Sequence, residues 1–380
     1  MVGRTEKGAA GRVVAVDGLA LRRLSVHLTS DDRRVISLPF FPGAEVRIRS
    51  LFERLGRLDE ADVEQALSEV LAGYAGRHRD LLATFEEHFV TGSSLAGLSP
   101  SWSVARRHLA GAYMTMEYSL ESTALFNPSI VPHPDQSDVP AGGVRFLMSL
   151  RATGEGHVSS IVFRTGVIDR GGGVSVDPPA DVLSRARMVA DHHYESPLFR
   201  RKLCEMGIDA SVADAVLAGL GERFTAASLT EAVRHARASL VESSPDVQSA
   251  VAQLETILWL AASNYHIDLS RRSELSELAI YPMSDLETHG VEDLRLVRFV
   301  DDDGTAEYYG TYTAWNGMRM LPMLIQSRYF RRIEVHSLNG QCAKNKGVAL
   351  FPRRVGGHFV MCSRIDGERL YISHSDYVHF

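Results

Sequence analysis

Hydrophobic positions along the chain change their spacing four times, and each change predicts a different kind of element. Up to about residue 50, apolar residues form short β-like runs. From 48 to about 95 they recur three and four positions apart, which is typical of amphipathic helices, and the pattern continues over 100–124. Asp59 is a candidate N-cap for one of these helices.

A proline-rich stretch over 126–143 then ends the helical pattern and marks a boundary. Residues 144–168 form two β-like runs around a small turn, which predicts a strand pair. A helical pattern returns from 181 to about 262. The last part is β-like again, and 288–317 reads as a hairpin, because an apolar strand and an aromatic, β-branched strand flank the turn sequence DDDG.

These patterns predict a mainly β protein with four regions. Residues 1–124 form an N-terminal region of short strands followed by helices, 125–180 a small β unit, 181–272 a helical insertion, and 273–380 further β units. Small antiparallel units at short spacing are typical of the blades of a β-propeller, whose pocket lies on the central axis. A β-sandwich is the alternative, because no tight sequence repeat supports a propeller.

Composition narrows the class of protein. The chain has 380 residues, a net charge of -6 and no long uncharged apolar run, which predicts a soluble protein without a membrane span and with no global attraction for nucleic acid. The N-terminus lacks an apolar segment followed by a cleavage site, so we expect a cytoplasmic location. Its three cysteines show no CxxC spacing, which favours reduced thiols over a zinc site. A homo-oligomer is possible.

Acidic residues at the mouth of the 288–317 hairpin are candidates for chemistry. Asp293 and Arg295 are two positions apart, so in a regular strand they would face the same side and could share one pocket, with Arg295 holding the carboxylate in one rotamer. Glu292 lies next to them. The alternative interpretation is a structural ion pair at the start of a strand.

Other candidate binding groups lie at strand ends. Arg151 ends a strand before the turn that carries Glu155 and His157, and it could form a salt bridge or bind an anion. Lys346 and Arg364 lie at the ends of later strands. Cations that converge from separate strands suit phosphate or another oxyanion, although each one alone is more typical of a solvated surface charge.

Candidate sugar-binding groups complete the set. Asn127 could hydrogen-bond a hydroxyl-rich ligand, although asparagine before proline is commonly turn chemistry. Tyr312 and Trp315 could supply an aromatic wall for a sugar. We expect at least half of the aromatic side chains of this strand to belong to the core instead.

Five stretches in this order together resemble glycoside hydrolase family 130, the β-mannoside phosphorylases and related mannosidases. They are FNPSIV, SLRATGEGHVSSIVFR, HGVEDLRL, YYGTYTAWNG and NKGVALFPRRVGGHFVMCSR. They correspond to the family's Asn-Pro opening, its arginine-ending strand, its GxEDPR motif, its YxxTYTAxxG strand and its NKxxxLFP strand. The resemblance covers about residues 125–180 and 273–380, and it leaves the two helical regions outside.

The resemblance implies a five-bladed propeller with a central sugar pocket and inverting phosphorolysis of β-mannosides to mannose 1-phosphate. Asp293 would be the acid, passing its proton through a sugar hydroxyl, and Arg151, Lys346 and Arg364 would be the phosphate-side cations. Inorganic phosphate would be the co-substrate, beside an oligosaccharide, with no other cofactor. Such a reaction needs only one protein acid, because phosphate is itself a competent nucleophile.

Two other functions fit the same residues. An inverting β-mannosidase would use Glu155 or Glu292 to position water, and a carboxylate about 6.5–9.5 Å from Asp293 across the pocket would support it. A sugar-binding or scaffolding propeller would have no catalysis.

The sequence departs from the family at three points. Leu294 replaces the usual proline, and Ser363 stands where many phosphorylases have histidine. The chain also stops within the expected third blade, so only about three of the five blades are expected and the isolated chain should have little activity.

Overall fold

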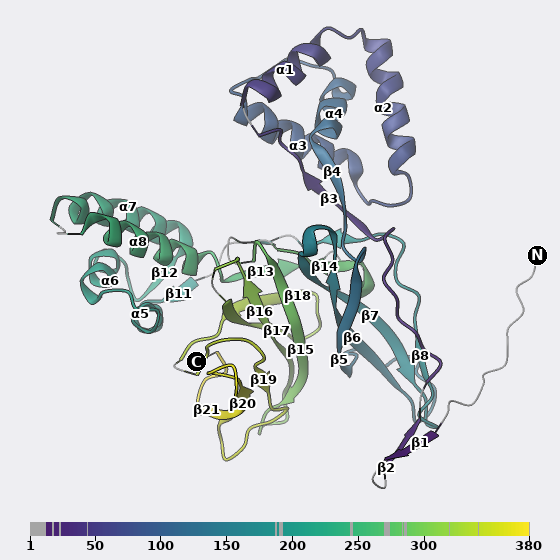
Figure 1. Ribbon diagram of the computed structural model, residues 1–380, viewed down its shortest axis with the longest axis vertical. Coiled ribbons are helices and arrows are strands. Elements are labelled where there is room, and N and C mark those ends of the chain that lie inside the picture. Colours follow the sequence, from purple (N-terminus) through teal and green to yellow (C-terminus); the bar gives the residue numbers. More distant parts are fainter. Residues whose placement is uncertain are drawn as a thin grey trace, which may run out of the picture.

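The computed structural model describes residues 13–16, 19–22, 24–43, 45–186, 188–189, 193–243, 246–269, 274–282, 284, 287–318, 320–340 and 342–379. In this part of the chain, a sheet of 12 strands forms the centre of the molecule, and two separate groups of helices extend from it (Figure 1). The fold is therefore mainly β with helices, as predicted. The order of the described strands runs from β10 at one end to β9 at the other, so this sheet is open.

The N-terminal region combines short strands with a helical lobe, which we define as residues 45–113. Its elements are β1 (Val13–Val16), β2 (Leu19–Arg22), β3 (Val35–Pro39), α1 (Glu45–Gly56), α2 (Glu60–Tyr74), α3 (Leu81–Leu95), α4 (Val104–Tyr113) and β4 (Thr115–Ser119). The predicted N-cap is confirmed, because the Asp59 side chain accepts a hydrogen bond of 2.8 Å from the Asp62 backbone N–H. The lobe has its own core around Phe52, Phe85 and Leu109.

One expectation for this region is wrong. The helical pattern predicted over 100–124 ends at Tyr113, and the next residues form β4, which pairs antiparallel with β3 along its whole length. The physical reason is a partner that is distant in sequence. Ile36 and Leu38 of β3 join Tyr118 and Leu120 in one apolar cluster, so pairing with β3 decides the conformation.

Two antiparallel meanders account for most of the large sheet. The first contains β5 (Ala124–Pro132), β6 (Val144–Thr153), β7 (Ser159–Ile168) and β8 (Val174–Val176); the second contains β15 (Gly290–Val300), β16 (Ala306–Trp315), β17 (Met320–Ser327) and β18 (Arg332–Ser337). The predicted strand pair and the predicted hairpin are confirmed as β6–β7 and β15–β16. Shorter strands extend the sheet: β9 (Ser184–Arg185), β10 (Met188–Val189), β13 (Tyr265–Asp268) and β14 (Leu278–Ile280).

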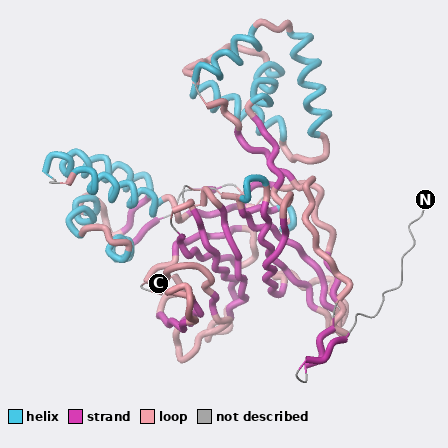
Figure 2. The backbone as a smooth tube through the Cα atoms, viewed as in Figure 1, coloured by secondary structure: helices cyan, strands magenta, loops and turns pink. Residues whose placement is uncertain are grey.

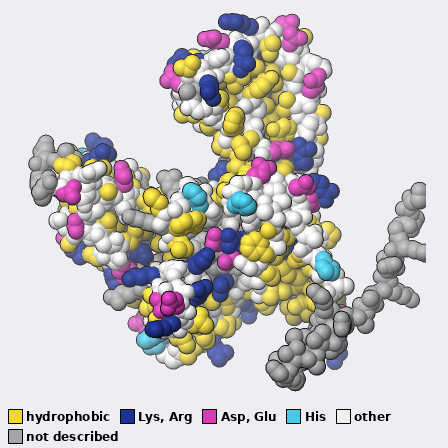
Figure 3. Space-filling model, in the orientation of Figure 1, with side chains coloured by type: hydrophobic (Ala, Val, Ile, Leu, Met, Phe, Trp, Pro, Cys, Tyr) yellow, Lys and Arg dark blue, Asp and Glu magenta, His cyan; other side chains and the backbone are white. Residues whose placement is uncertain are grey.

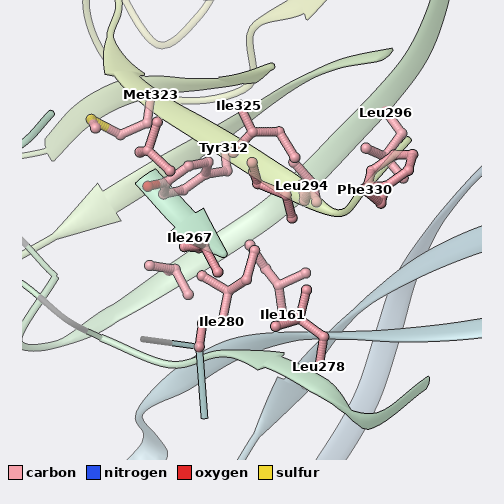
Figure 4. Close-up of a cluster of buried hydrophobic side chains, with 14 of the residues drawn as sticks. Ile161, Ile267, Leu278, Ile280, Leu294, Leu296, Tyr312, Met323, Ile325 and Phe330 are labelled. Carbon is pink, nitrogen blue, oxygen red and sulfur yellow. The ribbon is translucent and has the colours of Figure 1, made fainter. Parts of the chain in front are cut away.

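The two meanders approach each other closely at one glycine. Gly290 pairs with Ser159 in a parallel bridge and has a φ of +130°. A Cβ atom at this position would lie 2.9 Å from the Ser159 backbone nitrogen, so a larger residue would push β15 away from β7. Side chains from both meanders and from β14 form a common core, which includes Ile161, Leu278, Ile280, Leu294 and Met323 (Figure 4).

A separate three-stranded sheet, the C-terminal sheet, contains β19 (Ala349–Leu350), β20 (Phe359–Ser363) and β21 (Tyr371–Ser375). Two 3-10 turns, η1 (Glu155–His157) and η2 (Leu275–Glu277), connect strands elsewhere in the chain. Phe359 packs against Phe299 with ring centroids 5.1 Å apart, which joins the C-terminal sheet to the second meander.

The second helical group, the insertion, contains α5 (Ser196–Glu205), α6 (Ala210–Leu217), α7 (Ala226–Ser243) and α8 (Val247–Ala261), with β11 (His193–Glu195) and β12 (Arg223–Thr225) at its base. It has its own apolar core and lies apart from the N-terminal lobe (Figure 2). The helical pattern predicted from 181 is wrong at its start, because the described residues before Ser196 form short strands that pair with distant segments. No helix in the described ranges has both the length and the apolar character needed to cross a membrane.

Candidate functional site

Two β-bulges on different strands bring an amide and a carboxylate together. The register of β5 against β6 shifts between Phe126 and Ser129, and that of β15 against β16 shifts between Glu292 and Arg295. Asn127 and Asp293 lie in these bulges with φ angles of 51° and 57°. The Asn127 amide donates a hydrogen bond of 2.7 Å to Asp293 Oδ1. Left-handed backbone at residues other than glycine is unfavourable and, like bulges, is enriched at functional sites.

Arg151 of β6 connects three polar groups at this point. Its Nη1 donates to Asp293 Oδ1 at 3.3 Å, its Nη2 to Glu292 Oε1 at 2.9 Å, and its Nε to Ser159 Oγ at 2.9 Å. The guanidinium also lies over the ring of Phe126, 5.1 Å from its centroid. A fork of donors on two carboxylates and a hydroxyl holds all of these groups in defined positions.

Further cations lie beside the acidic pair. Lys346 Nζ is 3.7 Å from Glu292 Oε2. A Cβ atom at Gly347 would lie 3.6 Å from Arg364 Cδ and 3.9 Å from Arg295 Nη2, so these two arginines flank the residue next to Lys346. Figure 3 shows Lys and Arg side chains gathered near the centre of this face of the molecule. We call Asn127, Arg151, Glu292, Asp293 and Lys346, with the flanking Arg295 and Arg364, the acid cluster.

The predicted partnership of Asp293 with Arg295 is wrong. Among the described residues, the groups that hold the Asp293 carboxylate are Asn127 and Arg151, and no ion pair joins it to Arg295, which is exposed. The bulge is the reason, since it inserts an extra residue at this point and interrupts the regular alternation on which the prediction depended. Arg364 donates to the Gly367 carbonyl oxygen.

The predicted sugar-binding side chains lie in different environments. Tyr312 is buried in the core, where its hydroxyl donates to Glu287 Oε1 at 2.9 Å, so its ring is not a platform for a sugar (Figure 4). Trp315 is partly buried at the end of β16. Glu155 and His157 are exposed in η1, and among the described residues no side-chain hydrogen bond or ion pair joins them to the acid cluster. The structure therefore does not bring η1 into the acid cluster.

The acid cluster is accessible and rich in positive charge. Side-chain exposure is 28% for Asp293, 19% for Arg151 and 15% for Glu292, so these groups are partly covered but open to a ligand. One carboxylate with a fixed position, surrounded by cations from other strands, could give or take a proton beside a bound oxyanion. Within the described ranges, no group of three His, Cys, Asp or Glu side chains is arranged to hold a metal ion.

Sequence reasoning missed two features of this site. Ser159 was not identified as a partner of Arg151, because a single serine at the start of a strand carries no signal. The direct contact of Asn127 with Asp293 was also missed. The sequence gives only a partial signal for this contact. Asparagine and aspartate are the residues that most readily adopt left-handed backbone, but this preference does not indicate which two of them meet.

Comparison with known proteins gives weak likenesses to solved structures. One is a member of glycoside hydrolase family 130, the mannoside phosphorylases, in work on glycoside hydrolases that target β-1,2-mannosidic linkages in Candida mannan; the identity is 12% and the TM-score 0.30, over 68% of this chain and 48% of that one. Another is a β-1,2-mannobiose phosphorylase from Listeria innocua in complex with β-1,2-mannobiose, with 12% identity and a TM-score of 0.24 over 67% of this chain and 58% of that one. The chain thus spans about half the length of these proteins. No protein-family profile and no curated protein sequence matches the chain.

Proposed function

We propose that the acid cluster is the site of a carbohydrate-active enzyme that carries out inverting phosphorolysis of β-mannosides, with mannose 1-phosphate as a product. In this proposal Asp293 is the acid that helps the glycosidic oxygen to leave, and inorganic phosphate attacks the opposite face of the sugar. The oligosaccharide and phosphate are the two substrates. Mannose is proposed as the sugar because of the sequence motifs, and Asp293 is proposed as the acid because of its contacts.

The single observation that supports the proposal most strongly is the set of contacts made by Asp293. Asn127 and Arg151 hold the carboxylate from one side, at 2.7 and 3.3 Å. Lys346 approaches the neighbouring Glu292, and Arg295 and Arg364 flank Gly347. A phosphate dianion would gain charge-assisted hydrogen bonds from such a group of cations. On phosphate binding, contacts of Arg151 and Lys346 with phosphate would replace part of their contacts with Glu292. Asn127 would hydrogen-bond a sugar hydroxyl.

The same proposal interprets the meanders as propeller blades. The first meander, within 125–180, is then one blade, and the second meander and the C-terminal sheet, within 273–380, are two more. Asn127, Asp293 and Lys346 come from β5, from β15 and from the loop before β19, which would be the inner strands of the three blades. The N-terminal helical lobe and the helical insertion are additions to this unit.

An inverting mannosidase is the second candidate, because Glu292 contributes another carboxylate to the acid cluster. An inverting hydrolase requires a base that activates water on the face opposite the acid. Glu292 is adjacent to Asp293 in sequence, and Arg151 and Lys346 both approach it. These contacts favour a positioning role for Glu292 and so favour phosphate over water as the nucleophile.

The test is incubation of the purified chain with β-linked mannobioses of several linkages, with and without phosphate, followed by separation of mannose from mannose 1-phosphate. We expect a small but phosphate-dependent yield of mannose 1-phosphate, since the isolated chain should have little activity, and a further loss of about 1,000-fold in Asp293→Asn, because loss of a general acid removes a factor of about 10² to 10⁴. Asp303→Asn, in the exposed turn after β15, is the matched control. Free mannose formed equally well without phosphate would select the mannosidase, and no product from any substrate would contradict both enzymes.

A further inference from the structure

A second polar site lies away from the acid cluster, in a cavity of about 740 Å³ between the N-terminal helical lobe and the sheet. Its walls include Ser37, His78, Arg79, Ser184 and Arg185. No residue of the acid cluster lines it. The volume is sufficient for a small organic substrate, since ligand pockets commonly enclose about 300–1,000 Å³.

A continuous hydrogen-bond chain begins at the wall of this cavity with Ser37 and His78 and ends at Glu117, which is not part of the lining. Ser37 of β3 and Glu117 of β4 are paired directly opposite each other, so their side chains lie on one face of the hairpin. His78, from the loop that follows α2, lies between them. Its Nδ1 is 3.0 Å from Ser37 Oγ and its Nε2 is 2.6 Å from Glu117 Oε1. Hydroxyl, imidazole and carboxylate are thus joined in the order that activates a serine nucleophile.

The carboxylate of this chain is held as an anion. Arg77 donates to both oxygens of Glu117, from Nε at 2.9 Å and from Nη2 at 3.0 Å. Burial raises the pKa of Glu117, but the hydrogen bonds from Arg77 and His78 outweigh it and keep the pKa below its usual range. An ionised Glu117 attracts the imidazole proton to Nε2, which leaves Nδ1 to accept the proton of Ser37.

The surroundings of the chain suit acyl transfer. The His78 side chain is only 4% exposed, so its hydrogen bonds are shielded from water. Arg79 and Arg185 line the same cavity together with Asp80, Glu87 and Asp268, and Arg79 is paired with Glu277. A cation such as Arg185 can stabilise the oxyanion that forms when a carbonyl carbon becomes tetrahedral.

We propose that Ser37, His78 and Glu117 form a nucleophilic serine site that hydrolyses small carboxylic esters. Ser37 Oγ forms a bond to the carbonyl carbon while its proton passes to His78. The tetrahedral oxyanion then collapses, the ester C–O bond breaks, and the alcohol leaves with the proton from His78. Water attacks the acyl-Ser37 in the same manner, which releases the carboxylic acid and restores the hydroxyl. Ser37 and His78 are catalytic residues, and Glu117 is a positioning residue.

This site is independent of the mannoside proposal, because it uses other residues, another cavity and another reaction. Either proposal can fail without affecting the other. An ester bond is the proposed substrate because the hydrogen-bond chain supplies a nucleophile and a base.

The first measurement is covalent labelling of the full chain with a fluorophosphonate, which phosphonylates activated serines with release of fluoride. Mass spectrometry of the digested protein should locate the adduct on Ser37. This result does not depend on the folding of any variant. Absence of an adduct, or an adduct on a different residue, would overturn the proposal, because it would mean that the hydrogen-bond chain only links α2 to the hairpin.

The second measurement is hydrolysis of p-nitrophenyl acetate, followed as release of p-nitrophenolate. We expect Ser37→Ala to lose the activity and His78→Gln to lose about 100-fold, which is within the range for a general base. Glu117→Gln should lower kcat with little change in KM and alter the pH profile, an effect that a merely structural residue would not have. Ser122→Ala, which alters an exposed serine outside the cavity, is the control. Equal rates in Ser37→Ala and in the parent chain would contradict the proposal.

Discussion

Two networks of carboxylates and cations occupy very different environments in this protein. In the first, Glu121 accepts hydrogen bonds from Arg34 at 2.7 Å and from Arg164 at 2.8 and 2.9 Å, and the exposure of these three side chains is 4% or less. The remaining donors of Arg34 bind the carbonyl oxygens of Ala180 and Ser276. The second network is the acid cluster, where Asp293 and Lys346 are 28% and 50% exposed.

The difference separates a structural network from a candidate functional one. Around Glu121 the groups are covered and joined by distant parts of the chain, so the network ties the segments at 34, 121, 164 and 276 together. The acid cluster contains four cationic side chains but only two carboxylates, and the backbone is left-handed at Asn127 and Asp293. Partial exposure, an excess of positive charge and left-handed backbone are features expected of a ligand-binding site.

The largest effect should come from breaking the buried network. We expect Glu121→Gln to lower the free energy of unfolding by about 3–5 kcal/mol, because two arginines would remain buried with their charge uncompensated. Chemical denaturation followed by circular dichroism measures this loss. Glu231→Gln, which removes an exposed ion pair with Arg234, is the control and should change stability by less than about 1 kcal/mol. Equal losses in both variants would contradict the comparison.

A buried lysine that donates to a carbonyl oxygen should make stability depend on pH. Lys202 donates to the Leu338 carbonyl oxygen at 2.7 Å, and burial lowers its pKa from 10.5 to about 8 despite the opposing effect of Glu205. The unfolded chain therefore binds more protons than the folded chain between about pH 8 and 10.5, so stability should rise over this interval, by up to about 3 kcal/mol. Lys202→Met should remove this rise. The difference between the two denaturation series isolates the lysine from other groups that titrate there.

Arg151 should matter more for activity than for stability. Arg151→Lys cannot reach Ser159, Glu292 and Asp293 together, because an ammonium group lacks the planar fork of donors. For the proposed phosphorolysis we expect a loss of about 100-fold in kcat/KM, which corresponds to about 2.7 kcal/mol. The cluster is partly open to water, so the free energy of unfolding should change by less than about 1 kcal/mol. A large loss of stability with unchanged activity would instead show that Arg151 has a structural role like that of the arginines around Glu121.

The smallest effect should come from the bulge that holds Asn127. Asn127→Gly keeps the left-handed backbone accessible but removes the amide that contacts Asp293. We expect stability to stay within about 1 kcal/mol, while activity falls about 10-fold through poorer positioning of the acid. Kinetics and thermal unfolding of the same preparation check both parts. Asn345→Gly, another left-handed position but one before Lys346, tests whether strain alone accounts for the change.

Local patterns predicted much of the secondary structure. The hairpin around DDDG, the β6–β7 pair and the start of α2 after Asp59 agree with the structure. The failures have one cause. Residues Thr115–Ser119 and those just after 181 continue a helical pattern in sequence, but partners far along the chain pair with them as strands.

For the candidate site, the sequence alone determined which acids and cations are present and that several lie near the ends of β-runs. Tertiary structure decided which of them meet: it paired Asp293 with Asn127 and Arg151 instead of Arg295, and it buried Tyr312 in the core. Hydrophobic periodicity reflects contacts within a few residues, whereas Asn127 and Asp293 are 166 positions apart. Their contact depends on two bulges and on the approach of two meanders at Gly290, and only the packing of the sheet sets these.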